Sequence, residues 1–481
     1  MKLINPLVII RILSTILLIA TVSFLVCLPV SLIYGEESAP FLLSSLISGT
    51  AYAIFRISSI KAGMEKITAR DGFIAVTMSW LVFTAAGSLP YILSGTIPSF
   101  IDAFFESVSG FTTTGASILN DIESLPYSIL FWRNFTQWIG GLGIIVLVII
   151  ILPSLGITGQ QLMGLESSLR EKIHPRTKAI GFRLLIIYLG LTAAEIILLM
   201  FGEMDLFESI CHTLGTVSTG GFSTRNTSIM EYSAYSQYII ALFMLMSGVS
   251  FVVYYYVIKM QFSKVKHDDE LWFYLKITAG AGILAMVILI AQSGRAFEPA
   301  FREGFFQAIS IITTTGFVTT DYLLWPQAGT ILLFTLMFAG ASTGSTTGSI
   351  KMARHLIVIR NIKDTLKKLT HSSIITQVKL NRKTISEKNN MTILTFVGLY
   401  LFIFVTGTVI ITITGLDPVD SASGVAACLG NVGPALGSLG PMYNYSDIPG
   451  ISKLVFSLLM IIGRLEILTA FALFSRSFWK I

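Results

Sequence analysis

The chain has 481 residues, of which 53% are hydrophobic and only 12% are charged. An average soluble domain carries about 25% charged residues. Half that charge density, together with a mean hydropathy of +0.76, excludes a soluble globular protein and a disordered chain, and it predicts a helical protein with several membrane spans. The three cysteines lie far apart in apolar segments and show neither disulfide-framework nor metal-ligand spacing.

Ten apolar segments are long enough to cross a bilayer as helices, which takes about 20 residues each. Residues 8–33 form a first span rather than a signal peptide, because the segment is too long and no small-residue cleavage site follows it. Ten spans would place both termini on the same side. In chain order, the predicted spans are residues 8–33, 40–55, 73–93, 131–152, 182–201, 235–257, 271–291, 329–352, 392–414 and 451–474.

Lysine and arginine are distributed very unevenly between the two sides of this arrangement. Of the 33 basic residues, 27 lie on the side of the termini, five lie on the opposite side, and Arg464 lies within a span. Positively charged loops remain in the cytoplasm, so both termini are predicted to be cytoplasmic. The opposite face carries 16 acidic residues against five basic ones. A negative outer mouth would concentrate cations near the membrane surface. The plainer interpretation is that these acidic residues are simply solvated loop residues.

Four outer segments, which follow the third, fifth, seventh and ninth spans, repeat one pattern. Residues 104–115 and 305–316 are identical at seven of twelve positions without a gap, and both end in Thr-Thr-Thr-Gly. Each segment contains about a dozen apolar or small residues before a polar turn at glycine. The repeating unit is therefore a span, a half-helix, a glycine turn and a second span. After a two-helix segment at residues 1–70, the four units are predicted at residues 71–155, 156–260, 261–380 and 381–481.

Four such turns can meet around one axis in the membrane. Non-helical backbone at this depth is tolerated only where it is buried in protein or lines water. Carbonyl oxygens around an axis can replace the hydration shell of a cation, and hard oxygen ligands suit alkali ions. Glycine permits the close approach and the positive φ that such a backbone requires. The alternative is that the turns are re-entrant packing elements without an ion.

These turns resemble the filter motifs of the Trk/Ktr/HKT superfamily of potassium transporters, and most closely those of its bacterial Trk-type membrane subunits. The resemblance extends over nearly the whole chain, including the leading pair of spans. It implies a filter that selects K⁺ and Rb⁺ over Na⁺, with K⁺ as the bound ion and no covalent cofactor. The implied filter residues are Thr113, Thr114, Gly115, Ser218, Thr219, Gly220, Thr314, Thr315, Gly316, Asn431, Val432 and Gly433. The fourth turn departs from the pattern because it lacks threonine before its glycine.

The eighth span contains a candidate gate. Residues 339–349 have no large apolar side chain, and interior glycines cost a helix about 1 kcal/mol each relative to alanine. The segment can therefore be an unwound loop below the filter. Glycines at four-residue spacing can equally form a helix–helix interface. The resemblance implies the loop, with Gly340, Gly344, Ser345, Thr346 and Gly348 as gate residues.

Arg464 in the last span is the second candidate gate. A fixed arginine at span depth is an electrostatic barrier to cations, and the resemblance implies a place just below the filter. Glu466 is two residues away and faces another side of a helix, so it is a poor partner. The alternative is a structural arginine that pairs with Glu195 or with backbone carbonyls.

Residues 351–388 carry ten basic and two acidic side chains. Such a run fixes topology and attracts acidic lipid headgroups. The resemblance implies that it also docks a cytosolic nucleotide-binding ring protein of the RCK type, and that the chain forms a homodimer with one pore per subunit. The chain itself has no G-x-G-x-x-G after a strand, so nucleotide control would come from that partner. Nothing in the sequence predicts a nucleic-acid partner.

Together these features predict a potassium uptake system of the bacterial cytoplasmic membrane that is not an enzyme. No HExxH or paired aspartates lie in the spans. The membrane potential alone supplies about 2.3 kcal/mol per charge per 100 mV. The alternatives are a potassium symporter coupled to H⁺ or Na⁺, and the ion-translocating subunit of a potassium pump ATPase. The second would need a phosphorylated aspartate on another chain.

Overall fold

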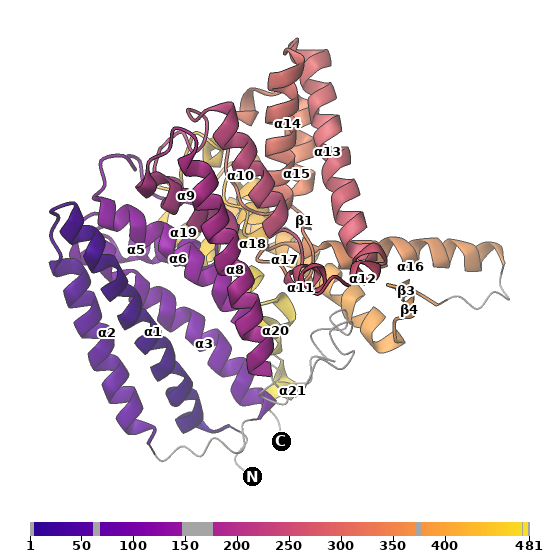
Figure 1. Ribbon diagram of the computed structural model, residues 1–481. Coiled ribbons are helices and arrows are strands. Elements are labelled where there is room, and N and C mark those ends of the chain that lie inside the picture. The colour runs from indigo at the N-terminus through magenta and orange to yellow at the C-terminus, as the bar shows by residue number, and fades with distance from the viewer. Residues whose placement is uncertain (1–3, 61–67, 147–176, 372–376, 474, 480–481) are drawn as a thin grey trace.

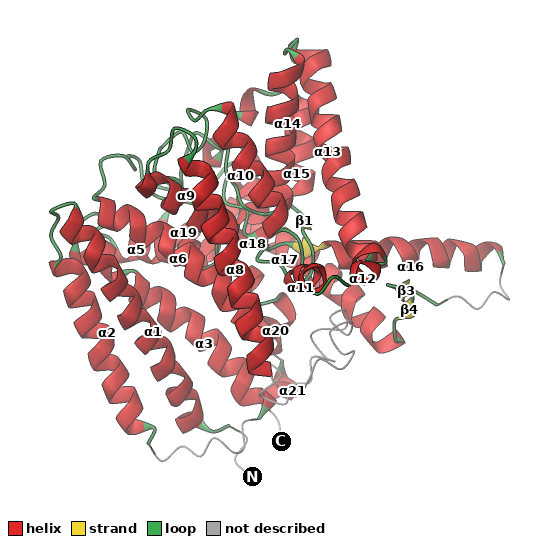
Figure 2. Ribbon diagram, in the orientation of Figure 1, coloured by secondary structure: helices red, strands yellow, loops and turns green. Residues whose placement is uncertain are grey.

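The computed structural model describes residues 4–60, 68–146, 177–371, 377–473 and 475–479, and these residues are mostly helical (Figures 1 and 2). Within the described part, the strands form two pairs of two residues each. Strands β1 (Ala339–Gly340) and β2 (Ile350–Lys351) are parallel, and β3 (Lys379–Leu380) and β4 (Lys383–Thr384) are antiparallel. The structure therefore agrees with the predicted helical class.

Six of the predicted spans correspond to described helices that are long and apolar enough to cross a membrane. In a further span, α6 (Tyr127–Val146) covers the described part of residues 131–152, and the remainder lies outside the described residues. The six are α1 (Pro6–Ile33), α2 (Ala39–Ser58), α3 (Ala69–Gly87) with its continuation α4 (Leu89–Leu93), α8 (Thr177–Met200), α13 (Asp269–Ser293) and α17 (Glu387–Ile413).

Three predicted spans are not single helices. Span 235–257 consists of α10 (Ala234–Ser247) and α11 (Phe251–Ile258), which meet at 92°. Span 329–352 contains α15 (Gln327–Leu336), which gives way to non-helical backbone before α16 (Met352–Thr370). Span 451–474 breaks at Glu466, where φ is +65°, between α19 (Gly450–Arg464) and α20 (Ile467–Ala472). Apolar composition fixes the length of a span, but it does not reveal where hydrogen bonds to other segments replace those of the helix.

Four short helices lie between these longer ones. Each packs against helices of its own unit. Three also contact another unit: α9 packs against α6 of the first unit, α14 against α10 of the second, and α5 against α19 of the fourth. These contacts link successive units and bring the C-terminal ends of the short helices toward the centre. The short helices are α5 (Phe100–Phe111), α9 (Leu206–Val217), α14 (Phe297–Ile312) and α18 (Pro418–Gly430).

The leading hairpin of α1 and α2 lies at one edge of the molecule (Figure 1). In the turn between them, the Glu36 carboxylate accepts hydrogen bonds from the backbone N–H groups of Tyr127 (2.6 Å) and Ser128 (2.9 Å). These N–H groups begin α6 and have no partner within the helix. The Tyr34 ring stacks on Tyr127 with centroids 4.1 Å apart. The hairpin is thus fixed to the first repeated unit.

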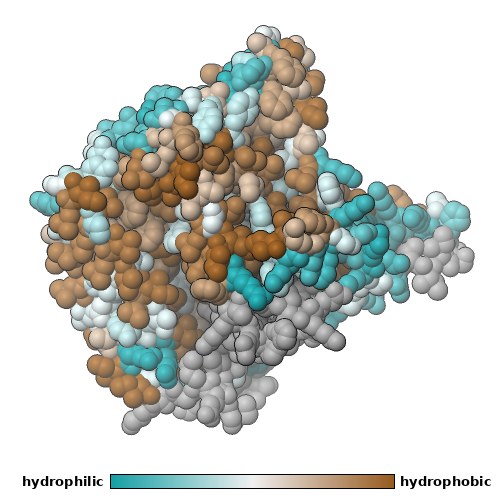
Figure 3. All heavy atoms as spheres, in the orientation of Figure 1, coloured by the Kyte–Doolittle hydropathy of each residue, from teal (hydrophilic) through white to brown (hydrophobic). Residues whose placement is uncertain are grey.

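Minor elements complete the described chain. They are α12 (Phe262–Lys266), α21 (Arg476–Trp479) and the 3₁₀ helices η3 (Tyr322–Leu324) and η4 (Gly437–Leu439). In Figure 3, hydrophobic side chains cover the middle of the visible face, whereas hydrophilic ones gather over the upper loops and around α16. Exposed hydrophobic side chains over the middle of a helical surface are typical of a protein that lies in a bilayer.

Candidate functional site: a ring of glycine turns and the loop beneath it

Each of the four short helices ends in the same unusual backbone turn. One residue just past the helix end has a positive φ, and so does the glycine two residues later. Positive φ strains a threonine, is tolerated by asparagine and is natural for glycine. The paired positions are Thr113 (φ 53°) and Gly115 (84°), Thr219 (57°) and Gly221 (78°), Thr314 (53°) and Gly316 (82°), and Asn431 (55°) and Gly433 (96°).

The second turn is shifted by one residue from the alignment that the sequence suggested. Gly221, rather than Gly220, occupies the position of Gly115. Ser218 caps the end of α9, where its hydroxyl donates to the carbonyl of Leu214 (2.6 Å). The sequence Gly220-Gly221 allowed either alignment, and only the backbone conformation distinguishes the two. Gly221 is therefore the turn glycine that the sequence prediction missed.

The four turns encircle one axis. An ideal Cβ placed on any of the four glycines would collide with a carbonyl oxygen of the next turn, and the series closes on itself. Such contacts require glycine because no side chain fits between the turns. The glycines and the residues whose oxygens they face are Gly115 and Gly220 (2.3 Å), Gly221 and Thr315 (1.9 Å), Gly316 and Val432 (2.2 Å), and Gly433 and Thr114 (2.4 Å).

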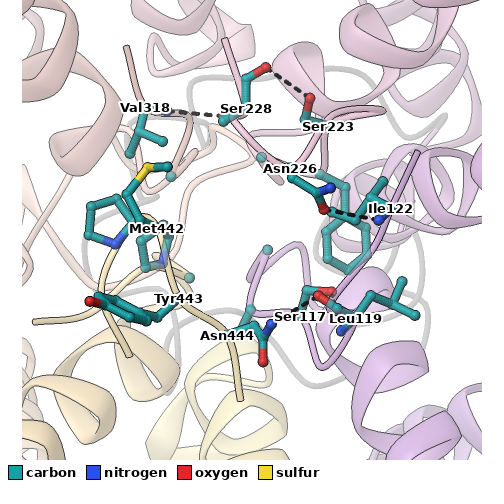
Figure 4. Close-up of a pocket in the computed structure, with 18 of the residues that line it drawn as sticks. Ser117, Leu119, Ile122, Ser223, Asn226, Ser228, Val318, Met442, Tyr443 and Asn444 are labelled. Carbon is teal, nitrogen blue, oxygen red and sulfur yellow. Dashed lines mark hydrogen bonds between the residues drawn. The ribbon is translucent and has the colours of Figure 1, made fainter. Parts of the chain in front are cut away.

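A vestibule of about 130 Å³ opens onto this ring and is lined by all four turn glycines. Figure 4 shows side chains of all four units around the same space, among them Ser117, Ser223, Val318 and Tyr443. The lining consists of residues that follow the glycines in each unit. The vestibule lies on the side of the ring that the charge distribution predicts to be external.

Different side chains hold the individual turns, so the ring is not strictly fourfold. The Gln137 side chain donates to the carbonyl of Gly220 (2.6 Å) and accepts from the N–H of Phe222 (3.0 Å). In the fourth unit, the Tyr445 hydroxyl donates to the carbonyl of Gly433 (3.0 Å). Backbone with positive φ is maintained only where the surroundings fix it. These bonds supply that support.

A buried ion pair within the first unit lies beside the vestibule and is hydrogen-bonded to the second unit. Arg133 of α6 and Glu106 of α5 are fully buried, with Nε and Oε1 2.9 Å apart. Glu106 also accepts from the N–H of Ile118 (3.0 Å), and Arg133 donates to the carbonyl of Ser223 (3.2 Å). Ile118 and Ser223 both lie in segments that directly follow the turn glycines of their units. The sequence prediction assigned Arg133 to the outer face and gave Glu106 no role, because the pairing depends on tertiary contacts.

On the other side of the ring lies the non-helical segment 339–351. Its neck is closed by the β1–β2 pairing, in which Gly340 lies opposite Lys351. An ideal Cβ on Gly340 would lie 2.2 Å from the carbonyl oxygen of Gly348. Gly344 at the tip has φ +78°. The segment is thus a loop, and the alternative of a glycine-mediated helix interface is wrong.

This loop contacts residues that precede the glycines, on the face of the ring opposite the vestibule. The hydroxyl of Thr219 donates to that of Thr346 (3.2 Å), which donates to the carbonyl of Val217 (3.3 Å). The N–H of Gly348 donates to the hydroxyl of Thr314 (2.8 Å). All five residues are buried. The loop therefore covers the inner face of the ring.

The loop is also hydrogen-bonded to the bend between α10 and α11 and to the start of α13. The N–H of Ser342 donates to the carbonyl of Gly248 (3.0 Å), and the N–H of Phe251 donates to the carbonyl of Gly344 (3.1 Å). The Glu270 carboxylate accepts from the N–H of Thr343 (2.6 Å). These bonds explain why the sixth predicted span bends where it does.

Arg464 is buried at the end of α19 and reaches this loop. Its guanidinium donates to the carbonyls of Thr346 (2.6 Å) and Gly140 (3.4 Å). The sequence left open whether Arg464 pairs with Glu195 or with backbone carbonyls. The structure shows backbone carbonyls, one in the loop and one in α6. Glu466 pairs instead with Arg354 of α16 (2.6 Å).

Long apolar helices around a closed ring of glycine turns define a polytopic helical membrane protein. Residues 44–481 match the TrkH family, which is described as cation transport protein. The Trk system potassium uptake protein TrkH of Halomonas elongata is 34% identical, covering 98% of this chain and 99% of its own length. TrkG of Escherichia coli K12, which bears the same description, is 34% identical over 96% of both chains.

A solved structure agrees with these relatives. The crystal structure of the potassium transporter TrkH from Vibrio parahaemolyticus superposes with a TM-score of 0.90 at 31% identity, covering 99% of this chain and all of the other. The chain belongs to the TrkH family, in agreement with the resemblance of its glycine turns.

Proposed function

We propose that this protein takes up potassium across the bacterial cytoplasmic membrane, passing K⁺ and Rb⁺ in preference to Na⁺ through the ring of glycine turns. The closed series of glycine–carbonyl contacts carries the proposal. It places four main-chain oxygens, of Thr114, Gly220, Thr315 and Val432, around one axis.

Such a ring suits a monovalent cation. Carbonyl oxygens replace its hydration shell, and the partial negative charge at the C-terminal ends of the four short helices adds to the attraction. Of the filter residues predicted from the sequence, all except Ser218 lie in the turns themselves. Gly221 joins them as the fourth turn glycine.

The buried loop and Arg464 form the gate in this proposal. Thr346 and Gly348 occupy the inner face of the ring, where an ion leaving it would pass. A guanidinium there repels cations. Conduction therefore requires the loop to move away from the ring.

Transport needs no chemical step, because the membrane potential supplies about 2.3 kcal/mol per charge per 100 mV. The protein is accordingly proposed to be a non-enzymatic channel or transporter. Coupling to H⁺ or Na⁺ remains the alternative form of the same function. The relatives that match 96–98% of the chain are named as Trk system potassium uptake proteins. Their names favour a channel or transporter over a subunit of a pump ATPase.

The proposed assembly has both termini in the cytoplasm, and the start of α1 and α21 lie at the same end of the molecule (Figure 1). Helix α16 extends from the body and belongs to the basic segment 351–388. That segment is the proposed contact for a cytosolic RCK-type partner and for acidic lipid. A homodimer is part of the same proposal.

Radiolabelled Rb⁺ flux into liposomes containing the purified full-length chain tests the function. Uptake driven by an inside-negative potential should be suppressed by external K⁺ and far less by the same concentration of Na⁺. Equal suppression by both ions, or no uptake, would contradict the proposal. Gly316→Ser should weaken discrimination against Na⁺, and a variant with intact selectivity would remove that glycine from the filter.

A further inference from the structure

Two consecutive carbonyl groups of the buried loop are each held by a cationic side chain. Arg464 donates to the carbonyl of Thr346 at 2.6 Å. Lys351, in β2 at the neck of the loop, donates from its ammonium to the carbonyl of Thr347 and to the hydroxyl of the same residue (2.8 Å). One cation comes from the last span and the other from the loop's own unit. The loop is therefore clamped from two directions.

The side chain of Lys351 is bound mainly by the loop, because the acidic groups near it are engaged with other partners. The side chain is buried, with the residue 9% exposed. The charged groups that act on it are Glu466, Arg464, Arg354 and Glu270. Of the two acids, Glu466 is paired with Arg354, and Glu270 accepts from the N–H groups that hold the loop and the start of α16. The ammonium is thus satisfied by oxygens of Thr347 rather than by a dedicated counter-ion.

An ammonium and a potassium ion compete for the same kind of ligand. Both bind hard oxygen atoms, and a lysine ammonium can donate up to three hydrogen bonds. The Thr347 oxygens lie one residue from Thr346, which contacts the ring. A positive charge fixed there also repels an ion that leaves the ring.

We propose that Lys351 is a second gating residue, a tethered cation that holds the loop closed by occupying oxygens of Thr347. Opening separates the ammonium from these oxygens and frees the loop to leave the ring. This inference rests on the proposed potassium function. The sequence alone counts Lys351 as the first residue of a basic topology segment, and only the fold brings its side chain back into the loop.

The test is Rb⁺ flux through the full-length chain in liposomes. Lys351→Met should raise the flux about tenfold, since charge-assisted hydrogen bonds that favour the closed loop are lost. Lys351→Arg, which keeps a donor and the charge, should remain near the parent value. Lys276→Met is the matched control, because Lys276 is an exposed lysine of α13 outside the basic segment 351–388. Its flux should not change.

Chemical rescue separates charge from packing. Lys351→Cys should conduct more than the parent, and aminoethyl methanethiosulfonate, which restores an ammonium, should lower the flux again. Propyl methanethiosulfonate, which is neutral and of similar length, should not. The parent chain treated with both reagents reports any reaction at its three buried cysteines.

The outcomes distinguish this inference from the proposed function. If Arg464→Ala raises flux and Lys351→Met does not, Lys351 has no gating role. If both reagents act equally on Lys351→Cys, its role is packing, and the inference is overturned. If the parent, Arg464→Ala and Lys351→Met all fail to pass Rb⁺, the proposed function itself is refuted.

Discussion

The most discriminating prediction concerns the two neighbouring glycines of the second turn. Gly221 has φ +78°, and an ideal Cβ on it would lie 1.9 Å from the carbonyl oxygen of Thr315. Gly220 has ordinary φ, and its ideal Cβ would lie 2.4 Å from Cδ of the Gln137 side chain. Alanine at 221 therefore meets backbone of the next turn, whereas alanine at 220 meets the side-chain amide of Gln137.

The expected effects follow from these contacts. A left-handed conformation costs an alanine about 1–2 kcal/mol, before the collision with the ring is counted. If that energy distorts the occupied ring, K⁺ binding relative to Na⁺ falls by about 5- to 30-fold, since 1.4 kcal/mol is a factor of ten. Gly221→Ala should lose that much selectivity, and Gly220→Ala should lose less.

The assay is Rb⁺ flux in liposomes with increasing Na⁺ or K⁺ as competitor, using Gly190→Ala as the control. Gly190 lies in α8, and apart from its chain neighbours and the backbone of its own helix no atom lies within 4 Å of an ideal Cβ there. A larger selectivity loss for Gly220→Ala than for Gly221→Ala would refute the alignment of the second turn. Equal and unchanged selectivity in both variants would remove this turn from the filter.

Three further predictions test the contacts that support the ring and the loop. Arg464→Ala should raise leak conductance, and Arg464→Lys should raise it less; unchanged or lower open probability in the purified protein would count against a gate. Glu106→Gln should lower the stability of the detergent-purified protein by about 3–5 kcal/mol, because a buried Arg133 charge loses its partner. Neutralising Arg133 as well should restore part of that loss in thermal unfolding, and a fully additive double variant would contradict the pairing. Glu270→Gln should increase basal Rb⁺ flux, since its carboxylate anchors the loop through Thr343 and charge-assisted bonds contribute about 1.5–3 kcal/mol. Thr343→Val, which removes only the hydroxyl contact, should have a smaller effect, and equal flux in both variants and the parent would exclude this anchor.

The sequence predicted those features that depend on local pattern. The matched Thr-Thr-Thr-Gly runs at 112–115 and 313–316 identified equivalent turns, which the structure shows with near-equal φ values. Apolar length located six of the ten spans as long helices among the described residues. Glycine enrichment at 339–349 allowed a loop, although it could not exclude a helix interface. These signals are local because motifs, apolar length and glycine content are properties of residues that are neighbours in the sequence.

The remaining features depend on contacts between distant segments. The sequence could not decide between Gly220 and Gly221, because the choice is fixed by packing against Thr315 in the next unit. The bend after α10 is stabilised by the loop about 100 residues later in the chain. Lys351 looked like one charge of a basic run. Periodicity and composition contain no information on which distant carbonyl a side chain will reach.

The central claim is that four segments of one chain surround a dehydrated monovalent ion, and anomalous scattering from crystals grown in Rb⁺ tests it most directly. The account predicts an anomalous peak on the axis enclosed by the carbonyl oxygens of Thr114, Gly220, Thr315 and Val432, and its loss when Na⁺ replaces Rb⁺. Rb⁺ peaks found only elsewhere on the protein, with none inside this ring, would contradict the account.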